Sequence, residues 1–392
     1  MRRFRAIFPE LHPFNDMNTI DTNNTGTKQI KVSVIMPIYN ADEYLRPALD
    51  SVIDQTLREI EIICVDDGST DGSLEILKEY QNKDDRIRIV TETNAGPALA
   101  RNNGIRRARG EYISFLDADD FIELDMLEQL YNEAKANDLD IVITNYDVYN
   151  SQKAEFSKAI VEENEDIYKG VSVTSKNDHP DEIFTSTNGS AWNKLYKTSF
   201  IMEKKLSFLT EVKTYEDVYF VLTSLSLAER VGKVHKVLLH HRVHSEQTRT
   251  RHFRKYFGQI PEIYVETKKF LTANGMFAPL SHAFVNISAS RCFKIYNLLG
   301  NESKGVFWDQ LHGGYAEKLG WSGREASDYD DEDVCEFVAN VQLYNHKQYK
   351  KRLLQGKMLC AKEIAIAIKK GGRCKLAMFF SKFTGRRAKA TK

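Results

Sequence analysis

The chain is poor in cysteine and has no long apolar segment. Its 392 residues include only five cysteines, an odd number. They lie far apart, with no Cys-x-x-Cys pair, which predicts neither a disulfide framework nor a zinc knuckle. The sequence has no apolar run of the roughly 18 residues that a membrane-spanning helix needs, and residues 1–30 have none of signal-peptide length. We therefore expect a cytoplasmic protein with reduced cysteines, no membrane span and a polar leader over residues 1–30.

The chain also lacks an excess of either charge, because 55 Lys and Arg balance 55 Asp and Glu. Overall neutrality argues against nucleic acid as a partner. Two glycine-rich loops are absent as well, Gly-x-Gly-x-x-Gly and Gly-x-x-x-x-Gly-Lys-Ser/Thr, which argues against dinucleotide reduction and P-loop phosphoryl transfer. The 42% apolar content predicts a globular chain, long enough for a large core and more than one domain.

The neutral total hides a strongly basic tail. Residues 347–392 hold fifteen Lys and Arg against one acid, Glu363, so their net charge is +14 and that of the remaining 346 residues is −14. Leu353, Leu354, Met358 and Leu359 recur among the basic residues at nearly helical spacing. This pattern predicts a basic amphipathic tail that lies on an anionic membrane surface and makes the protein peripheral to the inner face of the membrane. The alternative is docking on the acidic body or on a second subunit of a homo-oligomer.

Short apolar runs alternate with segments of helical periodicity over residues 31–145. Their ends recur about every 25–29 residues, close to the length of a βαβ unit. This alternation predicts an α/β fold, a doubly wound and mostly parallel sheet with helices on both faces. Helical periodicity returns over Phe253–Leu299, and we expect residues 251–346 to form a helical annex. The expected strands are 32–36, 60–65, 87–90, 112–116 and 140–144.

Acidic and small polar residues follow the predicted strands, at the edge where such sheets bind ligands. Asp117 and Asp119 are two residues apart in an extended segment, so their side chains project the same way. Two adjacent carboxylates repel unless donors or a cation share them, and oxygen ligands of this kind suit Mg²⁺ or Mn²⁺. The alternative is an acidic turn that caps the helix expected near Leu124.

This region contains four motifs, Val34–Asn40, Val65–Ser73, Asn94–Gly104 and Gly110–Asp120. Together they resemble the motifs of the family 2 nucleotide-sugar glycosyltransferases with the GT-A fold. The resemblance continues more thinly through Trp192–Tyr196, Glu216-Asp217 and Arg242-x-His244 to about residue 250. It implies a glycosyltransferase domain over residues 31–250, with a nucleotide-sugar half at 31–145 and an acceptor half at 146–250.

The resemblance also implies roles for single residues. Asp67 would bind the N–H of the nucleobase and Asp66 would support the turn beside it. Asp119 would be the main ligand of a divalent metal, Mn²⁺ or Mg²⁺, with His244 nearby as a second ligand. Gln247 stands where the family often has Ser. The remaining implied donor-site residues are Pro37 and Tyr39 at the base, Asn94, Gly96 and Arg101 at the diphosphate and sugar, and Asp117 and Ala118 at the ribose and sugar.

Glu216-Asp217 precedes an apolar segment of helical spacing. The family's catalytic base is the Asp of such a pair, which points to Asp217, with Glu216 on the acceptor side. Inverting transfer needs a carboxylate that takes the proton of the acceptor hydroxyl, and a metal that stabilises the leaving diphosphate. The alternative is a helix start with acids matched to its dipole. Trp192 would offer an aromatic face to the sugar or acceptor, unless it is a buried core residue.

The resemblance implies a metal-dependent inverting transfer of a sugar, typically from a uridine diphosphate sugar, to a saccharide or lipid-linked acceptor. Bacterial surface polysaccharide synthesis is the common setting of such enzymes. Two other readings remain, a sugar nucleotidyltransferase and a non-catalytic carbohydrate-binding module. The first would carry a glycine-rich, arginine-containing loop after the first strand, where this chain has Pro37–Asn40. The second is disfavoured by the acids at Asp117, Asp119 and Asp217.

Overall fold

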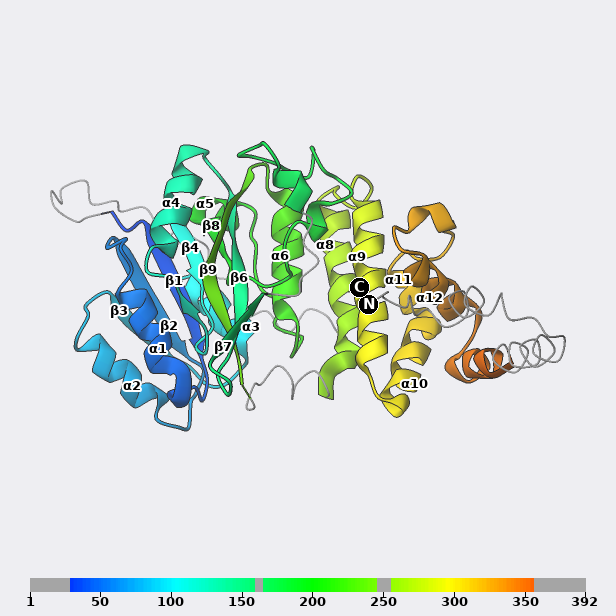
Figure 1. Cartoon of the computed structure of the whole chain (residues 1–392), viewed down its shortest axis with the longest axis horizontal. Coiled ribbons are helices and arrows are strands. Elements are labelled where there is room, and N and C mark those ends of the chain that lie inside the picture. Colours follow the sequence, from blue (N-terminus) through cyan, green and yellow to red (C-terminus); the bar gives the residue numbers. More distant parts are fainter. Residues whose placement is uncertain (1–28, 159–164, 245–254, 356–392) are drawn as a thin grey trace, which may run out of the picture.

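A computed structural model describes residues 29–158, 165–244 and 255–355 of the chain. Its centre is a nine-stranded sheet in the order β3-β2-β1-β4-β8-β6-β9-β5, with β7 paired to β6 (Figure 1). The strands are β1 (Val32–Ile38), β2 (Ile60–Asp66), β3 (Ile87–Thr91), β4 (Tyr112–Phe115), β5 (Phe121–Ile122), β6 (Ile141–Asn150), β7 (Glu155–Lys158), β8 (Lys194–Lys197) and β9 (Val231–Val243).

Strands β1 to β4 form the parallel part of the sheet that the sequence predicted. Strand β1 pairs in parallel with β2 and with β4, and β2 pairs in parallel with β3. All seven residues of β2 are buried, which explains why most of them are apolar, because a strand covered on both faces has no solvent-exposed side. Glu61 is the charged exception in the interior of the strand, and it forms ion pairs with Arg88 and Arg109. The carboxyl ends of these four strands therefore meet at one edge, as expected for a doubly wound sheet.

The second half of the sheet has a different order from the one that chain order suggests. The strand expected at 140–144 is present as the longer β6, but it does not lie beside β4. The short strand β8 lies between them and runs antiparallel to both. With only four residues, β8 carries too little periodicity to reveal its place, which depends on pairing with residues far away in the chain.

Helices cover both faces of the sheet (Figure 1). One hydrophobic core lies between the sheet and α1, α2 and α4, and a second lies between the opposite face and α3, α5 and α6. The helices up to this point are α1 (Asp42–Ile53), α2 (Ser73–Gln81), α3 (Pro97–Ile105), α4 (Met126–Ala136), α5 (Thr198–Glu203) and α6 (Glu216–Leu227). The GT-A-like arrangement thus places the ends of α3 and α6 near the edge where the acids lie.

The C-terminal helices pack onto α6, and the second core continues into them without a break. Two indoles at its centre are fully buried and hydrogen-bonded: Trp308 Nε1 donates to Tyr344 O at 2.8 Å, and Trp321 Nε1 to Ser288 Oγ at 3.0 Å. The predicted helical annex therefore shares one hydrophobic core with the sheet domain. Its helices are α8 (Ile260–Ala273), α9 (Ser281–Leu298), α10 (Asn301–Gln310), α11 (Ala316–Lys318) and α12 (Glu332–Leu343).

Several expectations fall outside the described residues. Most of the polar leader (1–30), residues 245–250 of the expected glycosyltransferase domain and residues 356–392 of the basic tail belong to this group. Among the residues that the structure does describe, no helix combines the length and the apolar character required to cross a lipid bilayer.

Candidate active site

Three carboxylates meet directly after β4. Oxygen atoms of Asp117, Asp119 and Asp120 lie within 4.8 Å of one another. His244, at the end of β9, approaches the same group, with Nε2 3.1 Å from Asp119 Oδ2. The other ring nitrogen of His244, Nδ1, is buried without a hydrogen-bond partner among the described residues. Clustered carboxylate oxygens with an adjacent imidazole form a donor set that fits Mg²⁺ or Mn²⁺.

Asp120 is the member of this cluster that the sequence analysis did not single out. Its carboxylate is fully buried, accepts the backbone N–H of Arg242 at 2.8 Å and lies 3.1 Å from Nδ1 of His241. Burial raises the pKa of Asp120 to about 6, although His241 opposes the shift. These contacts join the β4 loop to β9. The only signal in the sequence was a third acid beside Asp119, which a capping role explains equally well.

A buried arginine connects this cluster to the residues at the start of α6. Arg101, on α3, donates from Nη2 to Asp117 Oδ1 at 2.6 Å. Its Nη1 donates to Glu216 Oε1 at 3.0 Å and lies 3.0 Å from Asp217 Oδ1. Burial alone would lower the pKa of Arg101, but Asp217, Asp117 and Glu216 raise it. The arginine expected at the donor diphosphate thus joins the cluster of three carboxylates after β4 to the predicted base.

Asp217 occupies the first turn of α6 and is largely buried. Its Oδ2 accepts the backbone N–H of Ala191 at 3.1 Å. Burial raises the pKa of Asp217 to about 6, and the positive charge of Arg101 partly offsets this rise. A carboxylate with a pKa close to neutral is a better proton acceptor than an ordinary exposed one and is still ionised at pH 7.

The two acids after β2 are buried and bonded to backbone amides. Asp66 Oδ1 accepts the N–H of Ser69 at 3.1 Å, which supports the turn as expected. Asp67 accepts the N–H of Ala95 at 2.7 Å and of Gly96 at 2.8 Å, one on each oxygen. The carboxylate expected to meet the nucleobase therefore braces the loop before α3 in this structure, and a base contact would use its remaining lone pairs.

Gly68 explains how the loop from β3 comes so close to the turn after β2. Its φ is +72°, and a Cβ there would stand 3.0 Å from the backbone nitrogen of Asn94. Asn94 and Gly96 line a cavity of about 220 Å³ together with Lys213 and Glu216. Lys213 was not predicted, because a single lysine in a loop gives no signal in the sequence. The cavity joins the expected donor loop to the helix that carries Asp217.

The remaining predicted residues divide into exposed and buried ones. Tyr39 is 47% exposed at the end of β1, open to a ligand, with Pro37 partly buried beside it and Ala118 buried in the acidic loop. The position of Trp192 contradicts the expectation that its ring is open to the sugar or acceptor. The residue is only 4% exposed, and its ring stacks on His241 with centroids 5.5 Å apart. Packing between β6 and β9 leaves no open face for an acceptor, so the alternative of a core tryptophan applies.

The fold defines a structural class, the proteins of the GT-A type. The crystal structure of S. aureus TarS residues 1–349 in complex with UDP superposes with a TM-score of 0.63, covering 83% of this chain and 92% of that one at 21% identity. At that identity the similarity shows the fold.

Residues 33–192 match the model of the family described as Glycosyl transferase family 2. The chain is 35% identical over 246 residues to EpsH of Bacillus subtilis (strain 168), a glycosyltransferase by its name, covering 62% of this chain and 70% of EpsH. It is 34% identical to the poly(ribitol-phosphate) beta-glucosyltransferase of Bacillus spizizenii, over 52% of this chain but only 31% of that enzyme. The chain belongs to glycosyl transferase family 2 and is a glycosyltransferase.

Proposed function

We propose that this enzyme transfers a sugar from a uridine diphosphate sugar to a saccharide or lipid-linked acceptor, with inversion and with a divalent metal. We call the three acids after β4, Asp117, Asp119 and Asp120, the metal-binding edge. The observation that carries the proposal is that the single guanidinium of Arg101 forms ion pairs both with Asp117 of this edge and with Asp217 of α6. A donor anchored at the first group thus has a proton acceptor fixed beside it.

In the proposed reaction the acceptor hydroxyl oxygen attacks the anomeric carbon and its proton passes to a carboxylate oxygen of Asp217. The bond from the anomeric carbon to the diphosphate oxygen breaks, and that electron pair leaves with the nucleoside diphosphate. Attack from the face opposite the leaving group inverts the configuration. Arg101 and the N–H of Ala191 hold Asp217 in place during this transfer.

The donor set of Asp117, Asp119 and His244 supports a metal cofactor, Mn²⁺ or Mg²⁺. When bound, such an ion neutralises negative charge on the diphosphate. Tyr39 and Pro37 stand where a nucleobase would be enclosed, and Asn94 and Gly96 line the adjoining cavity. Solved structures of TarS with UDP and with UDP-GlcNAc make uridine diphosphate sugars the first donors to test.

We assign residues 31–250 to the glycosyltransferase domain, divided at residue 145, and residues 251–346 to a helical annex that supports α6. Bacterial polysaccharide synthesis is the proposed setting, in line with the relative that glucosylates poly(ribitol-phosphate) according to its name. Attachment of residues 347–392 to an anionic membrane stays a prediction. Liposome binding that is equal with and without residues 371–392 at low salt would contradict it.

The test is a thermal-shift screen of nucleotide sugars with and without Mn²⁺. A bound donor raises the unfolding temperature by mass action, so a uridine diphosphate sugar should do so in the presence of the metal and much less in its absence. The stereochemistry of product formed from the donor that binds is then read by NMR at the anomeric proton. A donor with another base, equal binding without metal, or a retained configuration would each contradict one part of the proposal.

A further inference from the structure

A second cavity lies on the other side of the acidic loop. Its volume is about 310 Å³, and we call it the aromatic pocket. It lies beside α1, which packs on the face of the sheet opposite α3 and α6, the helices that carry Arg101 and Asp217. The pocket is therefore distinct from the donor cavity. Its lining residues are Pro47, Ser51, Phe121, Tyr149, Phe156 and Arg242.

The rings of the aromatic pocket form one connected group. Tyr149 and Phe156 have centroids 4.9 Å apart, and Phe121 lies 5.5 Å from Tyr149. Phe156, on β7, is 55% exposed, which is unusual for a phenylalanine that contacts three other rings. The guanidinium of Arg242 lies 5.1 Å from the ring of Phe121 and 5.2 Å from that of Tyr149. The exposed ring of Phe156 is thus held in a fixed orientation by the rings that pack against it.

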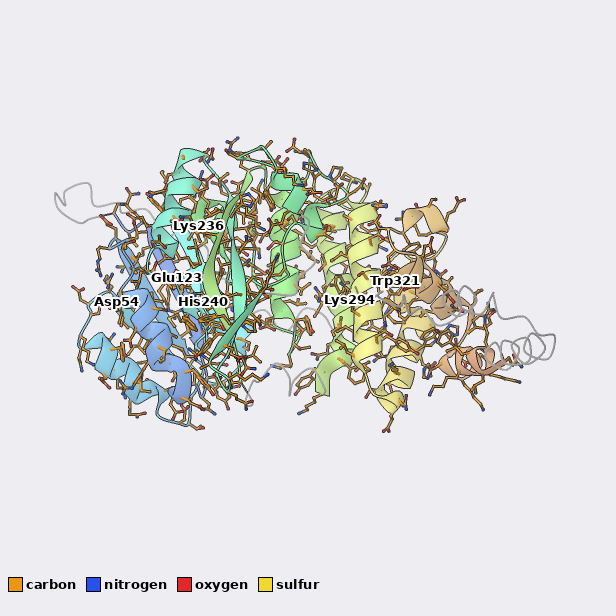
Figure 2. All side chains as sticks on the ribbon, in the orientation of Figure 1. Asp54, Glu123, Lys236, His240, Lys294 and Trp321 are labelled. Atoms are coloured by element: carbon orange, nitrogen blue, oxygen red, sulfur yellow. The ribbon has the colours of Figure 1, made fainter. Side chains whose placement is uncertain are left out.

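Acidic and imidazole groups border these rings. His240 packs on Phe121 and Phe156, with centroids 4.7 Å and 5.2 Å away. Its Nε2 lies 3.0 Å from Glu123 Oε1 and its Nδ1 lies 2.7 Å from Asp147 Oδ1. Figure 2 labels Glu123 and His240 close together on the sheet, and the Glu123 side chain is 51% exposed. A half-exposed carboxylate beside open rings can accept hydrogen bonds from hydroxyl groups.

This combination favours a neutral saccharide over other ligands. Sugar rings have an apolar face of C–H groups that packs on an aromatic ring and an edge of hydroxyls that donate to carboxylates. Arg242 is the one cation among the described residues of the lining, and it already donates to the backbone of Asp119 and packs on two of the rings. An anionic lipid or a nucleotide would meet repulsion from the two carboxylates of Glu123 and Asp147. A purely apolar chain would desolvate Glu123 and offer it no hydrogen bond in return.

The aromatic pocket is also mechanically connected to the metal-binding edge. Arg242 donates from Nε to the backbone oxygen of Asp119 at 2.7 Å. Tyr44, one turn before Pro47 on α1, packs on His244 with centroids 4.2 Å apart. The pocket and the predicted metal ligands therefore share the β4 loop, α1 and the end of β9.

We propose that the aromatic pocket is a saccharide-binding subsite, which holds a neutral sugar unit of the acceptor chain at a distance from the reacting hydroxyl. Its role rests on the proposed transfer to a saccharide acceptor, whereas its ligand chemistry does not. A remote subsite of this kind raises the effective concentration of a polymeric acceptor at the reaction centre.

The test measures saccharide binding alone, without nucleotide or metal. Maltohexaose, cellohexaose and chitohexaose are titrated into the full chain by calorimetry, and saturation-transfer NMR reads which sugar protons lie against rings. We expect at least one of them to bind with a Kd of about 0.1–1 mM, and Phe156→Ala to weaken that binding about tenfold or more. Phe156→Trp should retain it, because a larger ring keeps the stacking face.

Leu298→Ala is the matched control, since Leu298 is 73% exposed on α9, in the annex. Circular dichroism and the unfolding temperature check that each variant folds. The proposal is overturned if none of the three hexasaccharides binds, or if Phe156→Ala binds as well as the unchanged chain. Binding of an apolar dye that Phe156→Ala abolishes, without saccharide binding, would assign the pocket to apolar ligands instead. Because no donor is present, these outcomes are independent of whether glycosyl transfer itself is confirmed.

Discussion

The candidate active site, at the carboxyl edge of the sheet, and the helical annex bury opposite kinds of side chain. At the edge, Arg101, Asp120 and Asp217 are removed from water as charged or chargeable groups, held by ion pairs and backbone amides. In the annex the largest buried side chains are aromatic, Trp308 and Trp321 among them. Within residues 255–355 the buried polar side chains belong to Thr267, Asn286, Ser288, Asn340 and His346.

This difference has a physical meaning. A buried charge contributes little to stability, because its desolvation cost offsets most of the attraction of its partners, whereas a buried ring stabilises through the area it removes from water. The buried charges of Arg101, Asp120 and Asp217 are therefore candidates for the reacting groups that we propose, whereas α8 of the annex packs against α6, the helix that carries Asp217. Changes in the two regions should accordingly affect different measurements.

The largest effect is expected at the metal-binding edge. Asp119→Ala should reduce turnover by about 10⁴-fold or more, because the charge of the diphosphate then lacks its neutralising ion. A chelator should do the same to the unchanged chain, and Mn²⁺ should restore it. Release of nucleoside diphosphate is the measurement. Asp54→Ala, on an exposed acid after α1 (Figure 2), is the control. Turnover that is unaffected by the chelator would indicate that the acids after β4 cap the following helix and do not bind a metal.

Asp217→Asn should lower kcat by about 10²–10⁴-fold, the usual contribution of a general base. The amide keeps the size of the side chain and its contact with the Ala191 N–H but cannot take a proton. Donor affinity, measured by calorimetry with the uridine diphosphate sugar, should stay within a few-fold. A collapse of donor affinity would place Asp217 in the donor site and leave the base to be found elsewhere.

Arg101→Met tests the buried charge directly. It leaves Asp117, Glu216 and Asp217 without their shared cation, and we expect a loss of about 3–5 kcal/mol in the free energy of unfolding. The control is Arg46→Met, which removes an exposed ion pair with Glu79 and should cost less than about 1 kcal/mol. Urea denaturation measures both. Similar small losses in the two variants would mean that the buried cluster is not a tightly coupled unit.

Trp308→Ala is the matching test in the annex. Removing this fully buried indole should cost about 3–5 kcal/mol of unfolding free energy through the cavity it leaves. At temperatures where the variant is folded, its donor affinity should be unchanged, in contrast to changes at the candidate active site. A donor affinity that falls with stability would show that the annex shapes the donor site itself.

The smallest expected effect is on the pH profile. The pKa of Asp217 is raised to about 6 by burial, so the base is protonated and inactive below that pH. The kcat/KM should therefore be level above about pH 7 and fall about tenfold for each pH unit below 6. Arg101→Lys moves the positive charge away from Asp217, so it should raise the pKa of Asp217 and shift the fall in kcat/KM to higher pH. The ratio of kcat/KM at pH 5 and pH 7.5 measures this shift. A fall in kcat/KM with an apparent pKa near 4 in the unchanged chain would contradict the burial of Asp217.

Most of the parallel half could be predicted from the sequence. Buried strands such as β2 are mostly apolar, and the amphipathic helices between them repeat at a nearly constant interval, so local pattern and final structure agree. The strands expected at 60–65 and 87–90 agree within one residue with β2 (Ile60–Asp66) and β3 (Ile87–Thr91). The family's motifs in turn identified the loops at the carboxyl edge.

The sequence carries no signal for features that depend on contacts between distant residues, such as strand order and the burial of a single side chain. The place of β8 between β4 and β6 depends on pairs such as Tyr112 with Lys197, which leave no local period. Trp192 illustrates the same limit, since the residue type fits an acceptor platform and a core position equally well, and only its stacking on His241 distinguishes them.

The sequence by itself determined the class of fold, the family and the acids at the ends of the strands, because these depend on short motifs and on periodicity along the chain. Only the tertiary structure decided what those acids do to one another. Arg101 and Asp217 are 116 residues apart in the chain, yet their charged groups lie 3.0 Å from each other. The aromatic pocket likewise takes its rings from three different strands. Electrostatic coupling and ring packing act through space over a few ångströms, and no pattern along the chain encodes distances of that kind.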